Sequence, residues 1–171
     1  MGANQRAVAA LHAGASYEAV QSALLTFGGA HRRFEILYDE GGITIADDYA
    51  HHPKELSVTL ATAKQMEYDR VIAVFQPFTY SRTAMLLDDF AEALKIADLT
   101  VLSEIMGSRE VNDWNIYSAD LAAKIPGSTV CPDFEAIAKH VCSIAKKGDL
   151  IITMGCGDIY KVVPMIKEGL K

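Results

Sequence analysis

Residues 71–103, VIAVFQPFTYSRTAMLLDDFAEALKIADLTVLS, carry the clearest pattern of secondary structure in the chain. They begin with the uninterrupted apolar run Val71–Phe75, which is typical of a strand buried on both faces of a sheet. From Thr83 to Ala97 the apolar side chains recur at helical spacing, which predicts an amphipathic helix. A second apolar strand is predicted at Leu99–Ser103. Strand, helix and strand in this order indicate parallel strands joined by a right-handed crossover.

The same alternation extends on both sides of this stretch. Ser118 and Asp133 are expected to cap helices, and Pro53 suits a first helical turn because its missing N–H is not needed there. The pattern predicts a doubly wound α/β fold, with a mostly parallel sheet and helices on both faces. The further strands are expected at Phe34–Tyr38, Ile43–Ala46, Ser128–Cys131 and Leu150–Thr153, and the further helices at Pro53–Tyr68, Ser118–Ile125, 134–147 and Ile159–Lys167.

A short helical segment precedes this α/β pattern. One helix is expected at Asn4–Ala13, and Ser16 can cap a second helix that runs to about Phe27. The pair Gly28-Gly29 breaks that helix. We therefore expect a domain boundary there, with residues 1–28 on one side and residues 29–171 on the other.

Composition limits the class of protein. The chain has 171 residues, half of them hydrophobic and 22% charged, which suits one globular domain with a short piece of a neighbour. Its net charge of −6 argues against sequence-blind binding of nucleic acid. No apolar run approaches the roughly 20 residues that span a membrane. The three cysteines lack CxxC spacing, so neither a disulfide framework nor a metal site is predicted, and we expect a cytoplasmic protein.

The first candidate site follows the predicted strand Ile43–Ala46. It reads DDYAHHPKE over residues 47–55, and ligands of open α/β sheets bind outside the carboxyl ends of the strands. Asp47 and Asp48 can hold a divalent metal, a ribose hydroxyl or an ammonium group, and the histidines can bind phosphate or move protons. Alternatively, the carboxylates only end the strand and the histidines lie in a surface turn.

The second candidate site follows the strand Val71–Phe75. Arg82 lies close to a predicted helix start, and its guanidinium is suited to bind a carboxylate or phosphate through two parallel hydrogen bonds. Thr79 and Ser81 can donate hydrogen bonds or cap the helix. A capped helix with a solvated arginine is the alternative interpretation.

The third candidate site is the loop after the last strand, with Gly155, Cys156, Gly157 and Asp158. The glycines allow close approach of the backbone to a ligand. The loop lacks the full GxGxxG pattern, so it does not indicate a dinucleotide site. Asp158 is expected to cap the helix that follows, and Cys156 has no histidine beside it in the sequence that would activate a nucleophile.

Several of these segments together resemble the motifs of the Mur ligase family, and in particular of its alanine-adding members. The segment 29–35 is similar to the one that leads into the third domain of these enzymes. The order of the motifs along the chain also agrees with the family. The resembling segments are GAHRRFE at 29–35, DDYAHHPKE at 47–55, FQPFTYSRT at 75–83, FAEAL at 90–94 and MGCGDI at 154–159.

The resemblance implies part of an ATP-dependent amide ligase of peptidoglycan synthesis. Such enzymes activate the carboxylate of UDP-N-acetylmuramate as an acyl phosphate, which the amine of L-alanine attacks. Residues 29–171 would be the Rossmann-like carboxy-terminal domain, and residues 1–28 the helical tail of the central ATPase domain. The partners are then the amino-terminal and central domains, and the central domain mainly binds ATP and Mg²⁺. The chain contains no GxxxxGK[ST] loop, so we expect it to be inactive alone.

The resemblance also implies roles for single residues. Arg33 resembles a linker arginine that contacts the nucleotide, and Arg82 the arginine that binds the carboxylate of alanine. Asp48, His51 and His52 correspond to the loop where nucleotide and amino acid meet, and they are the predicted catalytic group.

The chain departs from the family pattern in the predicted amino-acid site. Phe78 and Thr79 stand where the family commonly has histidine and often arginine. This departure keeps open a Mur-type ligase for another amino acid or a peptide. A nucleotide-binding module without catalysis is the alternative from another class.

Overall fold

The computed structural model describes residues 3–26 and 31–171, and along the chain it divides into two units between His31 and Arg32. The expected break at Gly28-Gly29, and with it the boundary after residue 28, lies outside the described residues. The first unit consists of α1 (Ala3–His12) and α2 (Tyr17–Thr26), which contact one another. Ser16 caps α2 as expected, because its Oγ accepts a hydrogen bond of 3.2 Å from the Ala19 amide.

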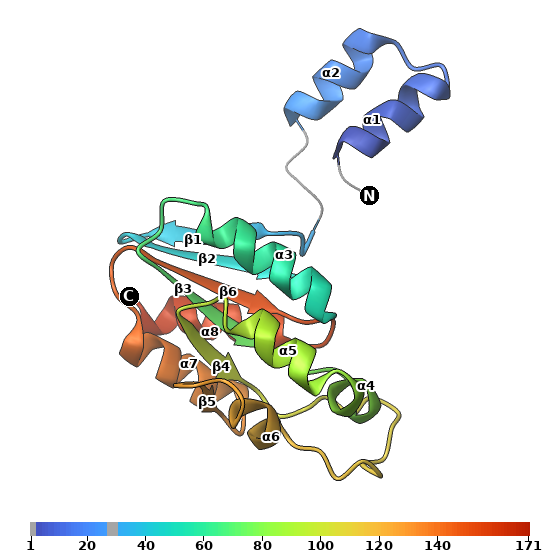
Figure 1. The fold of residues 1–171 in the computed structure, drawn as a ribbon. Coiled ribbons are helices and arrows are strands. Elements are labelled where there is room, and N and C mark those ends of the chain that lie inside the picture. Colours follow the sequence, from blue (N-terminus) through green and yellow to red (C-terminus); the bar gives the residue numbers. More distant parts are fainter. Residues whose placement is uncertain (1–2, 27–30) are drawn as a thin grey trace. The chain divides into compact units, whose positions relative to one another are not determined.

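The second unit is built on one six-stranded sheet (Figure 1). The strands lie in the order β1-β2-β6-β3-β4-β5, in which β1 and β2 are antiparallel and all other neighbours are parallel. The sheet confirms the predicted α/β class. The strands are β1 (Glu35–Glu40), β2 (Ile43–Asp48), β3 (Arg70–Phe75), β4 (Leu99–Leu102), β5 (Thr129–Val130) and β6 (Asp149–Met154).

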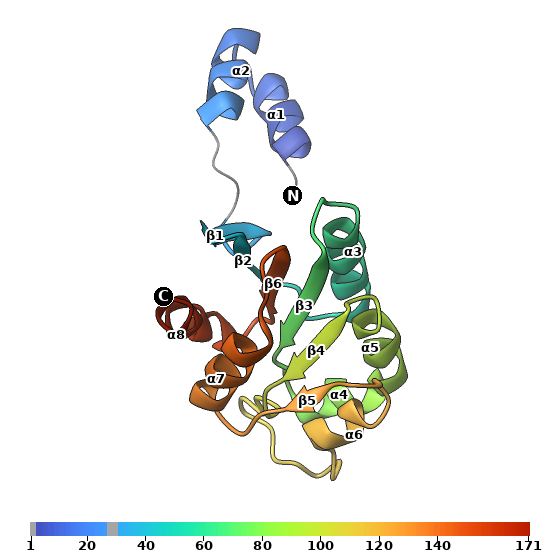
Figure 2. The ribbon, with the colours of Figure 1, turned by 90° about the vertical axis from the view of Figure 1, so that its left-hand side faces the viewer.

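Helices cover both faces of this sheet (Figure 2). Neighbouring residues of a strand point to opposite faces, so Leu150 and Ile152 of β6 belong to one buried cluster and Ile151 to the other. The first cluster contains residues of α3 (Pro53–Lys64), α5 (Leu87–Leu94) and α6 (Ser118–Ala122). The second contains residues of α7 (Phe134–Ile144), the 3₁₀ turn η1 (Ile159–Lys161) and α8 (Val162–Gly169). Every residue of β6 is buried, as expected of a central parallel strand.

Two local predictions were wrong. The single helix predicted at Thr83–Ala97 is two helices, α4 (Tyr80–Met85) and α5, because Leu86 leaves the helical region with φ −117° and ψ 24°. Ser118 does not cap α6 but lies inside it, where its hydroxyl donates to the carbonyl of Ser103 at 2.7 Å. The amide of Tyr117, which precedes the helix, is instead bound by the carboxylate of Asp120 at 2.8 Å.

The topology marks one place for a site. Strand β6 is inserted between β2 and β3, and the helix after it lies on the opposite face from the helices after its two neighbours. Connections that leave neighbouring parallel strands toward opposite faces create a crevice at the carboxyl edge of the sheet. The three candidate loops follow β2, β3 and β6, so all of them lie at this edge.

Candidate functional site at the carboxyl edge of the sheet

The side chain of Arg32, which is only 11% exposed, lies between the ends of β2 and β6. Its Nε donates to Oδ2 of Asp47 at 2.7 Å. Its two terminal nitrogens donate to the carbonyl of Gly155 at 2.7 Å and to that of Gly157 at 3.3 Å. Arg32 therefore joins the start of the unit to the ends of two central strands.

Two aromatic rings complete the surroundings of Arg32. The carbon of its guanidinium lies 5.0 Å from the ring centre of Tyr49 and 4.6 Å from that of Tyr160, within the range of cation–π attraction. Arg32 also adopts a left-handed backbone, with φ 54°, and its carbonyl accepts from the Tyr49 amide at 2.8 Å. The sequence indicated only that Arg32 and Arg33 stand together, and nothing in it showed which arginine is buried.

Arg33, the predicted nucleotide-binding arginine, is exposed. Its guanidinium carbon lies 5.7 Å from the ring centre of Tyr49, on the loop that follows β2. Arg33 thus presents its charge to solvent at the candidate edge, whereas its neighbour Arg32 is bound by the protein.

The two aspartates after β2 are both buried and both hydrogen-bonded. Asp47, which is 1% exposed, receives the hydroxyl of Thr153 at 2.6 Å in addition to Arg32. Asp48 accepts the amide of Phe34 on one oxygen and that of Ala50 on the other, each at 2.8 Å. In the structure the carboxylate of Asp48 therefore holds the loop after β2 against the segment that precedes β1.

The two histidines of this loop differ in their surroundings. Oε2 of Glu55 accepts the amides of His51 and His52 at 3.0 and 3.2 Å, and His51 Nδ1 lies 3.3 Å from the same oxygen. His51 Nδ1 also lies 3.1 Å from the carbonyl of Tyr49, so two acceptors favour a proton on that nitrogen. His52 is exposed and lines a groove of about 550 Å³ between α3 and α5, together with Asp89.

The pKa of the Glu55 carboxyl lies below its ordinary value of 4.5. Burial alone would raise this pKa, but the backbone N–H groups of His51 and His52, the His51 ring and the charge of Arg33 together lower it. Glu55 is therefore ionised at neutral pH, and it fixes the turn that carries both histidines.

Nη1 of Arg82 is buried and has no hydrogen-bond partner. Among the described residues, no other buried side-chain nitrogen or oxygen lacks a partner. A buried donor that makes no hydrogen bond is costly, and it is suited to receive an acceptor from a ligand. The Arg82 guanidinium also lies against the thiol of Cys156 in the loop after β6. Burial raises the pKa of the Cys156 thiol, and the nearby Arg82 and Arg32 reduce but do not cancel that rise, so the thiol remains protonated at neutral pH.

Phe78 and Thr79 precede the helix of Arg82 and pair with another loop. Phe78 forms an isolated parallel bridge with Met106, whose carbonyl accepts the amide of Thr79 at 3.0 Å. Thr79 adopts the left-handed backbone, with φ 66°, and contributes no side-chain cap to α4. Glu110, to which the sequence assigned no role, accepts the amide of Ser81 at 2.8 Å and its hydroxyl at 2.5 Å.

The crevice between β6 and β3 is closed by Gln76, another residue without a predicted role. Its Oε1 accepts the amides of Asp158 and Ile159 at 2.8 and 3.2 Å. The prediction that Asp158 caps the following helix by its side chain was wrong, because Gln76 binds these amides and the carboxylate of Asp158 pairs with Lys161 at 2.9 Å. Both crevices beside β6 are therefore occupied by side chains of the protein itself.

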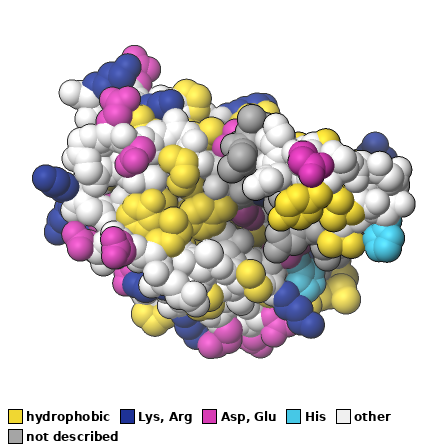
Figure 3. Space-filling model, turned by 90° about the horizontal axis from the view of Figure 1, so that it is seen from above, with side chains coloured by type: hydrophobic (Ala, Val, Ile, Leu, Met, Phe, Trp, Pro, Cys, Tyr) yellow, Lys and Arg dark blue, Asp and Glu magenta, His cyan; other side chains and the backbone are white. Residues whose placement is uncertain are grey.

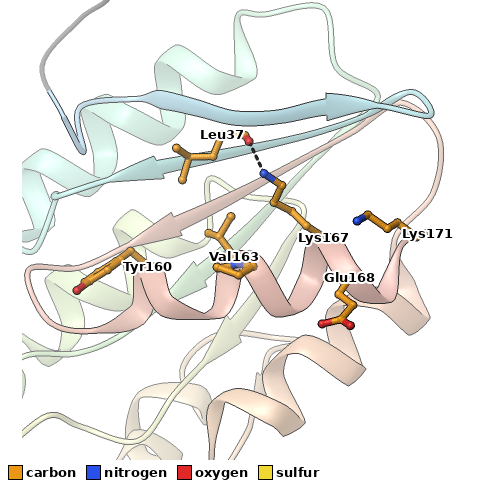
Figure 4. A pocket seen from close by; sticks show the side chains of 7 residues that line it. Leu37, Tyr160, Val163, Lys167, Glu168 and Lys171 are labelled. Carbon is orange, nitrogen blue, oxygen red and sulfur yellow. Dashed lines mark hydrogen bonds between the residues drawn. The ribbon is translucent and has the colours of Figure 1, made fainter.

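Another groove of the unit lies away from this edge. It measures about 580 Å³ between β1 and α8, where Lys167 donates to the carbonyl of Leu37 at 3.0 Å (Figure 4). None of the predicted site residues lines it. On the face seen in Figure 3, acidic and basic side chains are interspersed. Within residues 3–26 and 31–171 no group of three or more ligating side chains is placed to hold a metal, and no helix is long and apolar enough to cross a membrane.

Fold and site together define an α/β domain that presents polar loops at the carboxyl edge of its sheet, with a groove of about 270 Å³ among them that is lined by Gln76, Met106 and Asp158 among others. The family model for the Mur ligase, glutamate ligase domain, matches residues 32–157. The chain belongs to this family.

Relatives and solved structures agree with that assignment. A UDP-N-acetylmuramate–L-alanine ligase of Acetivibrio thermocellus is 44% identical over 92% of this chain and 35% of its own length. The UDP-N-acetylmuramate–alanine ligase structure from Thermotoga maritima matches with a TM-score of 0.74 at 27% identity, over 94% of this chain and 35% of that one. A murein peptide ligase from Psychrobacter arcticus matches with a TM-score of 0.67 at 31% identity, over 96% and 35%. The chain thus spans about a third of the length of these proteins.

Proposed function

We propose that this chain is the carboxy-terminal domain of an ATP-dependent ligase that joins L-alanine to UDP-N-acetylmuramate in peptidoglycan synthesis. The observation that carries the proposal is the buried Nη1 of Arg82, which makes no hydrogen bond within the described protein. A guanidinium binds a carboxylate through two parallel hydrogen bonds, and this nitrogen is available for one of them. The relatives' names, which state the same substrates, support the choice of amino acid.

The reaction makes one amide bond from a carboxylate and an amine. ATP phosphorylates the muramoyl carboxylate, the amine of L-alanine attacks the acyl phosphate, and inorganic phosphate leaves. In our proposal Arg82, with Thr79 and Phe78 beside it, binds the alanine carboxylate and so orients the amine. Arg33 contacts the nucleotide from its exposed position.

The loop after β2 supplies the remaining proposed roles. Asp48, His51 and His52 lie where nucleotide and amino acid meet, and His51 keeps Nε2 as an acceptor because its Nδ1 faces two acceptors. Mg²⁺, when bound, neutralises charge on the phosphates. As the resemblance to the Mur ligase family implies, we expect the ligands of Mg²⁺ and the main part of the ATP site in the other domains.

A ligase for a peptide is the second candidate, and two observations favour it. Phe78 replaces a polar residue of the alanine-adding pattern, and the murein peptide ligase structure is similar to the chain at 31% identity. The alternative of a separate nucleotide-binding module is less well supported. Arg32 and Gln76 lie on the two sides of β6, where a doubly wound sheet would hold a nucleotide, and both are hydrogen-bonded within the protein.

The test is ligation by the full-length protein that carries this chain, with L-alanine titrated at saturating ATP and UDP-N-acetylmuramate. Arg82→Ala is expected to raise the KM for L-alanine about 10- to 100-fold, which corresponds to a lost hydrogen bond to a charged group of ~1.5–3 kcal/mol. Arg82→Lys should recover little, because lysine lacks the planar fork. Lys139→Ala removes an exposed charge on α7 and is the control.

Three outcomes separate the alternatives. An unchanged alanine requirement in Arg82→Ala would mean that the carboxylate is bound elsewhere. Phosphate release that depends on a peptide and not on L-alanine would identify the second candidate. The third outcome is that the full-length protein binds ATP but releases no phosphate with either L-alanine or a peptide. This outcome would favour a nucleotide-binding module without catalysis.

A further inference from the structure

The loop between β4 and α6, residues 103–117, is attached to the loop that carries the proposed amino-acid site. Met106 exchanges two backbone hydrogen bonds with that loop, donating to Pro77 at 2.9 Å and accepting from Thr79 at 3.0 Å. Gly107 follows, and a side chain at its position would overlap the ring of Tyr80. The two loops are therefore in close contact just before α4 begins.

Glu110 extends this attachment into the first turn of α4. Its carboxylate binds both the amide and the hydroxyl of Ser81, the second residue of the helix, and its own amide donates to Gly107 at 3.0 Å to close a turn. The first amides of a helix have no partner within it and are commonly bound by the side chain of the N-cap residue. Thr79 is that residue here, but it makes no such bond. Glu110 supplies the missing acceptor from another loop.

The helix that depends on this contact is short. It has six residues, and a helix of that length is not stable by its own hydrogen bonds. Arg82 is its third residue, directly after Ser81, and its Nη1 is the buried donor described above. The direction of the guanidinium therefore depends on how the first turn of α4 is held.

We propose that Glu110 is a positioning residue of the amino-acid site, which holds α4 so that Arg82 faces the carboxylate of the incoming amino acid. This inference rests on the proposed function and deepens it. The hydrogen bonds from Ser81 lower the pKa of the Glu110 carboxyl, so it is ionised and accepts from both groups at neutral pH. Glu110 itself touches no reacting atom.

The kinetic test uses the full-length protein with Glu110→Ala, Glu110→Gln and Glu104→Ala. Glu110→Ala is expected to raise the KM for L-alanine about 10- to 100-fold, since small misplacement of a binding group costs factors of this size. The KM for ATP and kcat should change much less. Glu110→Gln keeps one oxygen acceptor and should recover most of the loss. Glu104, exposed on the same loop, is the matched control and should leave all constants unchanged.

Hydrogen exchange of the segment 77–86 gives a second readout that needs no turnover. Exchange should become faster in Glu110→Ala and stay unchanged in Glu104→Ala. The inference is overturned if Glu110→Ala leaves the alanine KM unchanged in an active enzyme, or if it impairs all substrates alike and Glu110→Gln restores nothing. If the wild-type enzyme shows no L-alanine-dependent phosphate release, the proposed function fails instead, and unchanged exchange in Glu110→Ala would then overturn the positioning role as well.

Discussion

At the scale of single residues, Arg32 and Arg33 are neighbours of the same type with different tasks. Arg32 is buried, paired with Asp47, and hydrogen-bonded to two carbonyls of the loop after β6. Arg33 is exposed beside Tyr49. Removing a partner of a buried ion pair leaves the other charge without compensation, whereas removing an exposed charge costs little.

Arg32→Ala is therefore expected to lower the free energy of unfolding by about 3–5 kcal/mol, because Asp47 is 1% exposed and keeps only the Thr153 hydroxyl. Arg33→Ala should change it by less than ~0.5 kcal/mol. Urea unfolding of the chain, followed by far-UV circular dichroism, measures both. Equal changes in the free energy of unfolding would contradict the conclusion that Arg32, and not Arg33, stabilises the fold.

The sequence located the candidate loops but not the partners inside them. It placed Asp47, Asp48 and Asp158 in loops after strands and Arg82 close to a helix start, because strand and helix patterns are local. It could not show that Gln76 binds the amides of the loop after β6, since the two are 82 residues apart in sequence. Contacts of this kind depend on which strands become neighbours in the sheet, and local sequence does not encode that order.

At the scale of elements, the six predicted strands are all present, whereas the helix ends and one helix break were predicted less well. Buried parallel strands are marked by continuous apolar runs, which few other elements produce. The break at Leu86 has no glycine or proline to mark it. The apolar positions Leu86, Phe90 and Leu94 recur at helical spacing and lie at or after the break, so they predict α5 but do not show where α4 ends.

At the start of α3, Glu55 is expected to make the free energy of unfolding depend on pH. Glu55 accepts the amides of His51 and His52, just before α3 begins, so Glu55→Ala should lower the free energy of unfolding by about 1 kcal/mol at pH 7. Glu55→Gln should cost less, because glutamine can take the same position in a capping box.

The sign of the pH effect follows from the lowered pKa of Glu55. The stabilisation by its charge is present above its ordinary pKa of 4.5 and is lost as the pH falls through the lower pKa of the folded state. The difference in unfolding free energy between wild type and Glu55→Gln should therefore shrink below pH 4.5. Urea titrations between pH 3 and pH 7 measure it, and a constant difference over this range would contradict the prediction.

At the scale of the whole molecule, the second unit has a doubly wound α/β topology in which side chains of the protein occupy both sides of the central strand β6. Arg32 and Gln76 occupy the two places beside β6, and the polar groups that remain accessible are carried by the loops above the edge. In the proposed function, these loops complete a site that is formed together with other domains.

We therefore expect the 171-residue chain alone to release no phosphate from ATP in the presence of UDP-N-acetylmuramate and L-alanine. It contains no GxxxxGK[ST] loop to bind the phosphates, and its described residues form no metal cluster. The full-length protein, assayed under the same conditions, is the positive control. Alanine-dependent phosphate release by the chain alone would mean that its edge loops hold ATP and the sugar substrate without the other domains, and Arg33 and Asp48 would then be the first residues to substitute.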